Sequence, residues 1–292
     1  MTGTGGKGIK VNGAFVQGNS DGTGPALVVS TTGSAAGTSS GGGWGGPGGG
    51  GGVSGSAKAI KVLGTITLNG GTSEVTTATN GAEGIESKTS ITINGGKHYY
   101  KAYDDGMNCD GFIKFAGGLT IVYSFGNDAI DSNYGHSGAI EIGNGAVVAY
   151  TSKGAPEEGF DCDNNSYITI TGNGYAVSAG ASQGGGGGLG GSSGIGSAVQ
   201  GYCLSTSSLS YSTGRYYTFY NGTTSMGFTY SMETGLSSSL SLFTCKGMTK
   251  GGSYNIKYST SAPTGATSSW HGVYIGGTPG TSSGTFTSFT AN

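Results

Sequence analysis

The chain has 292 residues, of which 65 are glycine and 34% are hydrophobic, and its formal net charge is −2. Its 13 Lys and Arg residues form no cluster, so it lacks the basic footprint that nucleic-acid binding requires. Its longest purely apolar run, about the length of AVVAY, is far below the roughly 20 residues of a membrane-spanning helix. We therefore expect no nucleic-acid partner and no membrane span.

A short motif recurs along the first half of the chain, with an apolar residue flanked by charged or amide side chains. It takes the forms KGIKV, KAIKV, EGIES, DGMNC, DAIDS and EGFDC, which begin at Lys7, Lys58, Glu83, Asp105, Asp128 and Glu158. Between the motifs lie alternating strands separated by a glycine turn, as in SITINGGKHYYKAY. The usual spacing of about 22 to 25 residues accommodates three short strands and three turns. This repeat unit is typical of a parallel β-helix.

The predicted fold is all-β, and residues 1–200 form the stacked coils. Ile66, Ile91, Ile113, Ile140 and Ile168 are expected to stack in one interior row, because side chains alternate between the two faces of a strand. The glycine-rich stretches 33–55 and 180–196 interrupt the repeat at the same place. We expect loops inserted at one corner of the helix, with flexible spacers as the alternative.

The period is lost from about Tyr202. Residues 201–292 contain denser strands such as RYYTFYNG, MGFTYSM and SYNIKYS, joined by turn-rich segments. This pattern predicts an antiparallel β module. Because an uncovered last coil would expose apolar interior and strand edges, we expect the module to cap the helix.

Stacking the motifs on one another predicts two charged rows at one corner of the coils. The basic residues Lys7, Lys10, Lys58 and Lys61 come first, and the next four coils are acidic or amide. Stacked carboxylates repel one another, so a cation is expected between them. Oxygen donors without His or Cys favour Ca²⁺. The predicted ligands are Glu83, Glu86, Asp104, Asp105, Asn108, Asp110, Asp128, Asp131, Glu158, Asp161 and Asp163.

The alternative for the acidic row is a solvated ridge without metal. The four lysine positions are expected to hold no metal, and their side chains either pack their stems at the surface or pair with the last acidic coil. Cys109 and Cys162 fall on the same row with a whole coil between them, which is too far for a disulfide, so both should be free and buried. For Cys203 and Cys245 the sequence leaves pairing open.

At the segments ITINGG, DDGMNCD, NDAIDSN and EGFDCDN, which start at Ile91, Asp104, Asn127 and Glu158, the chain resembles a family of bacterial secreted carbohydrate-binding domains. The resemblance covers residues 56–175 well, residues 4–32 more weakly and the C-terminal module loosely. It implies a calcium-binding, right-handed parallel β-helix related in fold to pectate lyases. It also implies a secreted or cell-surface location and a cellulose- or pectin-like polysaccharide partner. Since no leader pattern opens the sequence, we expect a mature or trimmed fragment.

The first functional hypothesis is non-catalytic carbohydrate binding. Strand alternation points Tyr99, Lys101, Tyr123 and Tyr150 outward, where aromatic rings could stack on sugars. The alternative is that these tyrosines pack under the C-terminal module.

Two further functions stay open. A pectate-type lyase would need Lys97, Lys101 or Lys153 as the base, because Arg215, the only arginine, lies outside the repeat. A structural surface fibre or adhesin would associate end to end through uncovered coils and the glycine-rich loops.

Overall fold

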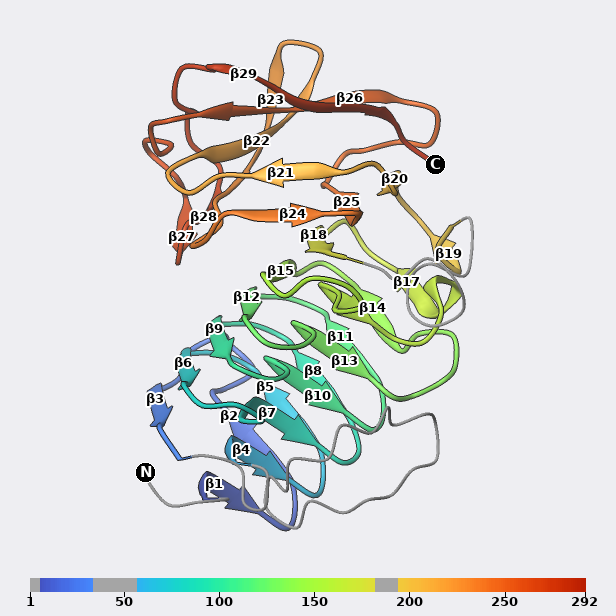
Figure 1. Ribbon diagram of the computed structural model, residues 1–292. Coiled ribbons are helices and arrows are strands. Elements are labelled where there is room, and N and C mark those ends of the chain that lie inside the picture. Colours follow the sequence, from blue (N-terminus) through green and yellow to red (C-terminus); the bar gives the residue numbers. More distant parts are fainter. Residues whose placement is uncertain (1–5, 34–56, 182–193) are drawn as a thin grey trace.

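The computed structural model describes residues 6–33, 57–181 and 194–292 (Figure 1). These residues are organised as β-strands and one short 3-10 helix, η1 (Asn165–Tyr167). Within these ranges no helix has the length and apolar character needed to cross a bilayer. The predicted loops 33–55 and 180–196 fall almost entirely outside the described residues.

Three sheets run along the repeat, and each complete coil contributes one strand to each of them (Figure 1). The first sheet contains β1 (Lys7–Val11), β4 (Lys58–Val62), β7 (Glu83–Ser87), β10 (Met107–Cys109), β13 (Ile130–Ser132) and β16 (Phe160–Asp161). The second contains β2 (Phe15–Gln17), β5 (Ile66–Leu68), β8 (Ile91–Ile93), β11 (Ile113–Phe115), β14 (Ile140–Ile142), β17 (Ile168–Ile170) and β19 (Ser197–Ala198). The third contains β3 (Ala26–Thr31), β6 (Thr72–Thr77), β9 (Lys97–Ala102), β12 (Leu119–Ser124), β15 (Ala146–Thr151) and β18 (Tyr175–Gly180). All these strands pair in parallel with the matching strands of the neighbouring coils.

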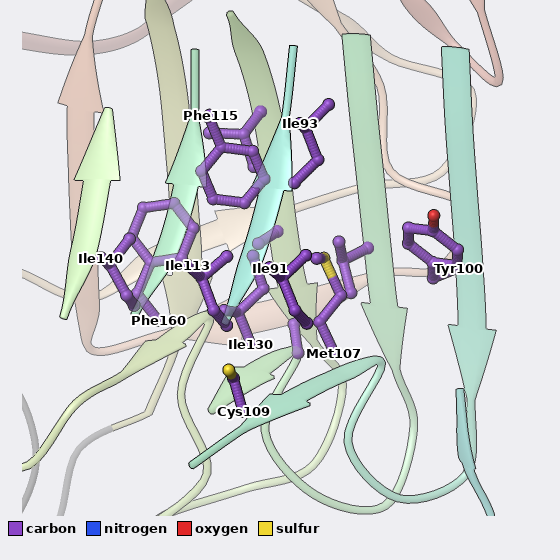
Figure 2. Close-up of a cluster of buried hydrophobic side chains, with 14 of the residues drawn as sticks. Ile91, Ile93, Tyr100, Met107, Cys109, Ile113, Phe115, Ile130, Ile140 and Phe160 are labelled. Atoms are coloured by element: carbon purple, nitrogen blue, oxygen red, sulfur yellow. The ribbon is translucent and has the colours of Figure 1, made fainter. Parts of the chain in front are cut away.

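The predicted isoleucine row is confirmed. In the second sheet Ile66 pairs with Ile91, Ile91 with Ile113, Ile113 with Ile140 and Ile140 with Ile168, and the row is buried throughout. The apolar centres of the motifs form a matching row in the first sheet. Figure 2 shows side chains of both rows meeting in one interior cluster. Each coil therefore hides its apolar face against its neighbours.

The C-terminal strands form an antiparallel module, as expected. One small sheet pairs β21 (Leu209–Tyr211) with β24 (Leu236–Ser238). A larger sheet contains β22 (Tyr216–Asn221), β23 (Thr224–Tyr230), β26 (Ser253–Ser259), β27 (Ser268–Trp270), β28 (Val273–Ile275) and β29 (Gly284–Thr290). Two more strands, β25 (Leu240–Thr244) and β20 (Tyr202–Ser205), extend the third sheet beyond β18 in antiparallel pairing.

The module caps the stack only in part. Strands β25 and β20 cover the end of the third sheet, in agreement with the prediction. The module also packs over the outer face of that sheet, where Ile121, Val148 and Val177 share one buried cluster with Phe228 and Tyr230. The prediction of a module that only closes the last coil is therefore incomplete. Strands β12 and β15 of the third sheet are covered on both faces and are buried at every position, whereas β3 and β6 are not.

The four cysteines are free and buried. Cys109 and Cys162 are thus free and buried as predicted, and Cys109 has the small residues Ser87 and Ser132 as its register partners in the first sheet. Burial raises the pKa of the Cys109 thiol to about 11, so this thiol is protonated at neutral pH.

Candidate functional site

The charged motifs meet at the first sheet in the predicted order. Register pairing runs from Lys10 to Lys61, Glu86, Asn108, Asp131 and Asp161 across six strands. Lys7, Lys58 and Glu83 are register partners in the second row. The stacking of the charged residues in successive coils is therefore confirmed.

Lysines balance the charge of the β7 coil. Glu86 lies 3.1 Å from Lys58, 2.9 Å from Lys61 and 2.6 Å from Lys88. Lys58, itself 4% exposed, also pairs with Glu83. Burial acts to raise the pKa of Glu86, but hydrogen bonds from Lys88 and Lys61 bring it down to about 2. Lysines of the chain therefore compensate Glu86, whereas burial keeps the pKa of Glu83 raised although Lys58 opposes it.

Lys88 also forms an ion pair with another of the predicted metal ligands. Its ammonium lies 2.9 Å from the carboxylate of Asp110. Glu83, Glu86 and Asp110 are thus engaged by lysines, and we leave them out of any calcium site.

Amide groups instead of cations bridge the carboxylates of the next coils. Asn108 Nδ2 donates to Asp105 at 2.9 Å and to Asp131 at 3.0 Å, across two coils. Asn127 Nδ2 donates to Asp105 at 2.8 Å. The backbone N–H of Glu158 donates to Asp128. We call Asp105, Asp128, Asp131 and Asp161, with Asn108, the amide-bridged corner.

The carboxyl groups of the amide-bridged corner resist ionisation. Burial and the carboxylate of Asp161 raise the pKa of Asp131 to about 7. Burial and neighbouring carboxylates also raise the pKa values of Asp105 and Asp128 well above the ordinary range. Burial raises the pKa of Asp161 as well. Ionised carboxylates are therefore costly here, and a cation would relieve that cost.

The remaining predicted ligands lie around this corner. Asp104 is largely buried beside Asp105, Glu158 is 1% exposed, and Asp163 is exposed in a turn with φ of 63°. Across residues 6–33, 57–181 and 194–292, no three Asp, Glu, His or Cys side chains converge closely enough to hold a metal ion as they stand. The oxygen donors suit Ca²⁺ in kind, but their arrangement is not a preformed cage.

The predicted tyrosine patch points outward but is not exposed, and this part of the prediction is wrong. Tyr99, Tyr123 and Tyr150 are 5%, 7% and 1% exposed, because the C-terminal module covers them. Lys101 pairs with Glu233 of the module at 2.8 Å. Tyr99 donates to the same carboxylate, and the backbone N–H of Glu233 donates to Tyr150 at 3.2 Å. These side chains join the two parts of the molecule, and the buried tyrosine rings offer no face to a sugar.

A hollow beside the third sheet was not predicted from the sequence. It has a volume of about 670 Å³ and lies between the turns that precede the third-sheet strands and the β27-β28 hairpin. Gly71, Gly96 and Gly118 line one side of it, and Trp270 and Ile275 line the other. The glycines recur in the sequence with the coil period, which was the available signal. Nothing periodic connects them to Trp270.

Residues 8–129 match a family model described as carbohydrate-binding domain-containing protein. The matched segment starts in β1 and ends just before β13, so it contains most of the coil repeat and none of the C-terminal module. Searches among curated proteins and among solved structures gave no significant match. The family similarity connects the coil repeat with carbohydrate binding.

Proposed function

We propose that this protein binds polysaccharide outside the cell without chemically altering it. The observation that carries the proposal is the family similarity over residues 8–129, which lies on the stacked coils. The parallel, in-register coils fit a right-handed parallel β-helix, the architecture that we propose for residues 1–200. Such a stack presents long, regular surfaces along its axis, which suit an extended polymer.

A depletion assay tests this function. Purified protein is mixed with insoluble cellulose or with a calcium-pectate gel, and the protein left in solution is measured against a non-binding control protein. We expect depletion that saturates with added polysaccharide and is competed by soluble fragments of the same polymer. Absence of depletion with both matrices, together with no signal on a glycan array, would contradict the proposal.

We further propose that Ca²⁺ stabilises the coils at the amide-bridged corner. The support is the donor chemistry together with the raised pKa values of Asp105, Asp128 and Asp131, because a bound cation would favour the ionised form that burial disfavours. Asp161, the register partner of Asp131, would complete the donor set from the next coil. When bound, the ion would supply positive charge between neighbouring coils and take the place of the amide bridges. Elemental analysis of purified protein measures whether calcium is present.

The positions of the candidate bases support a non-catalytic role. Lys97 donates to Ser269 of the module at 3.1 Å, and Lys101 is paired with Glu233. Arg215 lies over the ring of Tyr258, 4.1 Å from its centroid. Lys153 lies near Glu157, where its charge opposes the effect of burial on the pKa of that carboxyl group.

A lyase assay tests the absence of catalysis. Lyase activity would create an unsaturated uronide that absorbs in the ultraviolet. We expect no increase in absorbance when the protein is incubated with polygalacturonate and calcium. An increase that Lys153→Ala removes would establish an enzyme.

A second candidate, a fibre subunit, is favoured by one observation at the N-terminal end of the stack. Among the described residues, β1, β2 and β3 are each the last strand of their sheet, and Val16 and Val28 are 60% and 73% exposed. Such edges can pair with another copy. Sedimentation velocity over a range of concentrations distinguishes a monomer from end-to-end assemblies.

A further inference from the structure

The floor of the hollow beside the third sheet is made of backbone. Gly71, Gly96 and Gly118 occupy the same turn of successive coils, with φ values of 78°, 87° and 73°. A Cβ on Gly96 would lie 2.7 Å from the carbonyl oxygen of Gly71, and one on Gly118 would lie 2.8 Å from that of Gly96. Only glycine fits such positions. The turns therefore form a smooth strip that runs from coil to coil along the stack.

The residue after each glycine forms the border of this strip. Thr72, Lys97 and Leu119 are register partners in β6, β9 and β12 and line the hollow. They offer a hydroxyl, an ammonium and an apolar side chain in a row. Among the described residues, no carboxylate lines the hollow and Lys97 is its one charged side chain.

The opposite wall is the β27-β28 hairpin. Its two-residue turn, His271 and Gly272, has φ values of 38° and 80°, as in the type I′ turns that suit tight hairpins. The His271 ring stacks on Tyr99 with 3.8 Å between centroids, and its Nε2 lies 3.3 Å from Glu74. The hydrogen bond from Lys97 to Ser269 adds a third attachment. These contacts hold the hairpin in place before any ligand binds.

Trp270 is the aromatic residue that this hairpin brings to the hollow. It is half-buried, and its ring meets the edge of His271 at 4.9 Å with an interplanar angle of 77°. Its Nε1–H has no hydrogen-bond partner among the described residues. This N–H is buried, so the part of Trp270 that can meet a ligand in the hollow is its half-buried ring.

We propose that this hollow binds an extended, neutral polysaccharide chain, with one pyranose ring stacked on Trp270. The proposal rests on the proposed function and assigns a binding site to it. A volume of about 670 Å³ lies within the range of small-ligand sites, which is roughly 300–1,000 Å³. Aromatic faces pack on the apolar faces of sugar rings, while the backbone strip, Thr72 and Lys97 supply hydrogen bonds to hydroxyls. The single ammonium already bonds within the protein, so an acidic polymer finds little charge to pair with.

The two walls come from different parts of the chain. The coil-side lining residues lie at positions 22–24, 71–72, 96–97 and 118–119, all inside the segment that matches the carbohydrate-binding family model. Ser268, Trp270 and Ile275 come from the C-terminal module. The module therefore completes the saccharide site as well as covering the third sheet.

Tryptophan fluorescence tests the site directly, because the chain has only 2 tryptophans. In a Trp44→Phe background Trp270 is the sole tryptophan. We expect a saturable change in its emission on titration with cellohexaose, a neutral probe, and a much smaller change with a galacturonate hexamer. An emission change with the acidic probe alone, which chelator removes, would assign binding to the amide-bridged corner and overturn the proposal.

Substitution gives an independent readout on the full-length chain. Trp270→Ala should weaken cellohexaose binding about tenfold, as loss of one stacked ring implies, and Trp270→Phe should restore most of it. Tyr220→Ala is the matched control, because this half-buried ring lies on β22 and does not line the hollow. Thermal unfolding of each variant checks that the fold is kept. If Trp270→Ala unfolds, the Phe variant and the fluorescence titration decide.

The outcomes distinguish failure of the proposed binding site from failure of the proposed function. Binding by the wild type that Trp270→Ala leaves unchanged, or that Tyr220→Ala abolishes, would move the site elsewhere and leave carbohydrate binding intact. No binding of any polysaccharide by the wild type would overturn the function and the site together.

Discussion

Two parts of the same corner hold their buried carboxylates in opposite ways. On β7, Glu86 is surrounded by three lysines, and the pKa of Glu86 falls to about 2. Two coils further along the same row, Asp131 meets amides and another carboxylate, and its pKa rises to about 7. The backbone repeat places both side chains equivalently. The electrostatic result is decided by which side chains the neighbouring coils and turns supply.

The largest expected loss of stability comes from removing a lysine that pairs with the buried carboxylates of β7. Lys58→Met keeps the apolar stem but leaves Glu83 and Glu86 buried without their shared ammonium. Breaking a buried ion pair by removing one partner costs on the order of 3–5 kcal/mol. The free energy of unfolding from urea titration should fall by about that amount. Lys10→Met, at an exposed position of the first sheet, is the control and should change stability by less than about 0.5 kcal/mol.

An equal loss in both variants would show that Lys58 does not compensate the β7 carboxylates.

Calcium should stabilise the fold by binding at the amide-bridged corner. At a hundredfold excess over Kd, a bound ion adds about 2.7 kcal/mol to the free energy of unfolding, so a chelator should lower the Tm by several degrees at neutral pH. Asp128→Asn with Asp131→Asn should remove most of that shift. Asp110→Asn, which touches the lysine-paired half, is the control and should leave the calcium-dependent shift unchanged. A Tm indifferent to chelator, with no metal in elemental analysis, would leave this corner a metal-free ridge.

The pH dependence of stability should separate the two halves in chelator-treated protein. Between about pH 4 and pH 7 the folded state holds a proton on Asp131 that the unfolded chain has lost, because the pKa rises from 3.8 to about 7 on folding. Stability must therefore fall as the pH rises through this window, on the order of 1–3 kcal/mol after screening of the half-buried group.

Glu86 acts in the opposite sense. Its contribution is present above its ordinary pKa of 4.5 and is lost as the pH falls toward 2. Urea unfolding from pH 3 to pH 8 should thus show maximal stability near pH 4, and added calcium should flatten the decline toward neutral pH. A curve that rises steadily to pH 7 would contradict an uncompensated corner.

The smallest effect is expected where a salt bridge is open to water. Lys114 and Glu141 are register partners on the second sheet, 2.8 Å apart, with side chains 38% and 21% exposed. Solvent screens such a pair, so Glu141→Gln should cost less than about 0.5 kcal/mol. A loss comparable to that of Lys58→Met would mean that burial does not set the difference between ion pairs in this fold.

Periodicity in the sequence predicted the coils well, because a stacked repeat must place the same kind of side chain at the same point of every coil. It could not predict which faces are covered. The outward positions of the third sheet hold Ile121 and Val148 beside the tyrosines, and these aliphatic residues were the sign that a second layer lies above them. Compensation by Lys88 was also hidden, since this residue lies in a turn outside the motif.

The hollow depends on a contact between residues far apart in sequence. Lys97 and Ser269 are 172 residues apart, and no local pattern brings them together. Trp270 was therefore beyond the reach of sequence reasoning, although the glycines opposite it were visible in every coil.

The third sheet and the C-terminal module share one apolar core. The number of coils with an apolar outer face must therefore match the area that the module covers. Along one outward row, Val28 is 73% exposed, Glu74 is half-exposed, and Tyr99, Ile121 and Val148 are buried. During synthesis the coils emerge first, with this apolar face uncovered until the last strands follow, and transiently exposed apolar surface favours aggregation. Gain of a coil by duplication would lengthen the apolar face past the reach of the module. The number of coils with an apolar outer face is therefore tied to the extent of the C-terminal strands, whereas the coils of Val28 and Glu74 already lie outside that cover.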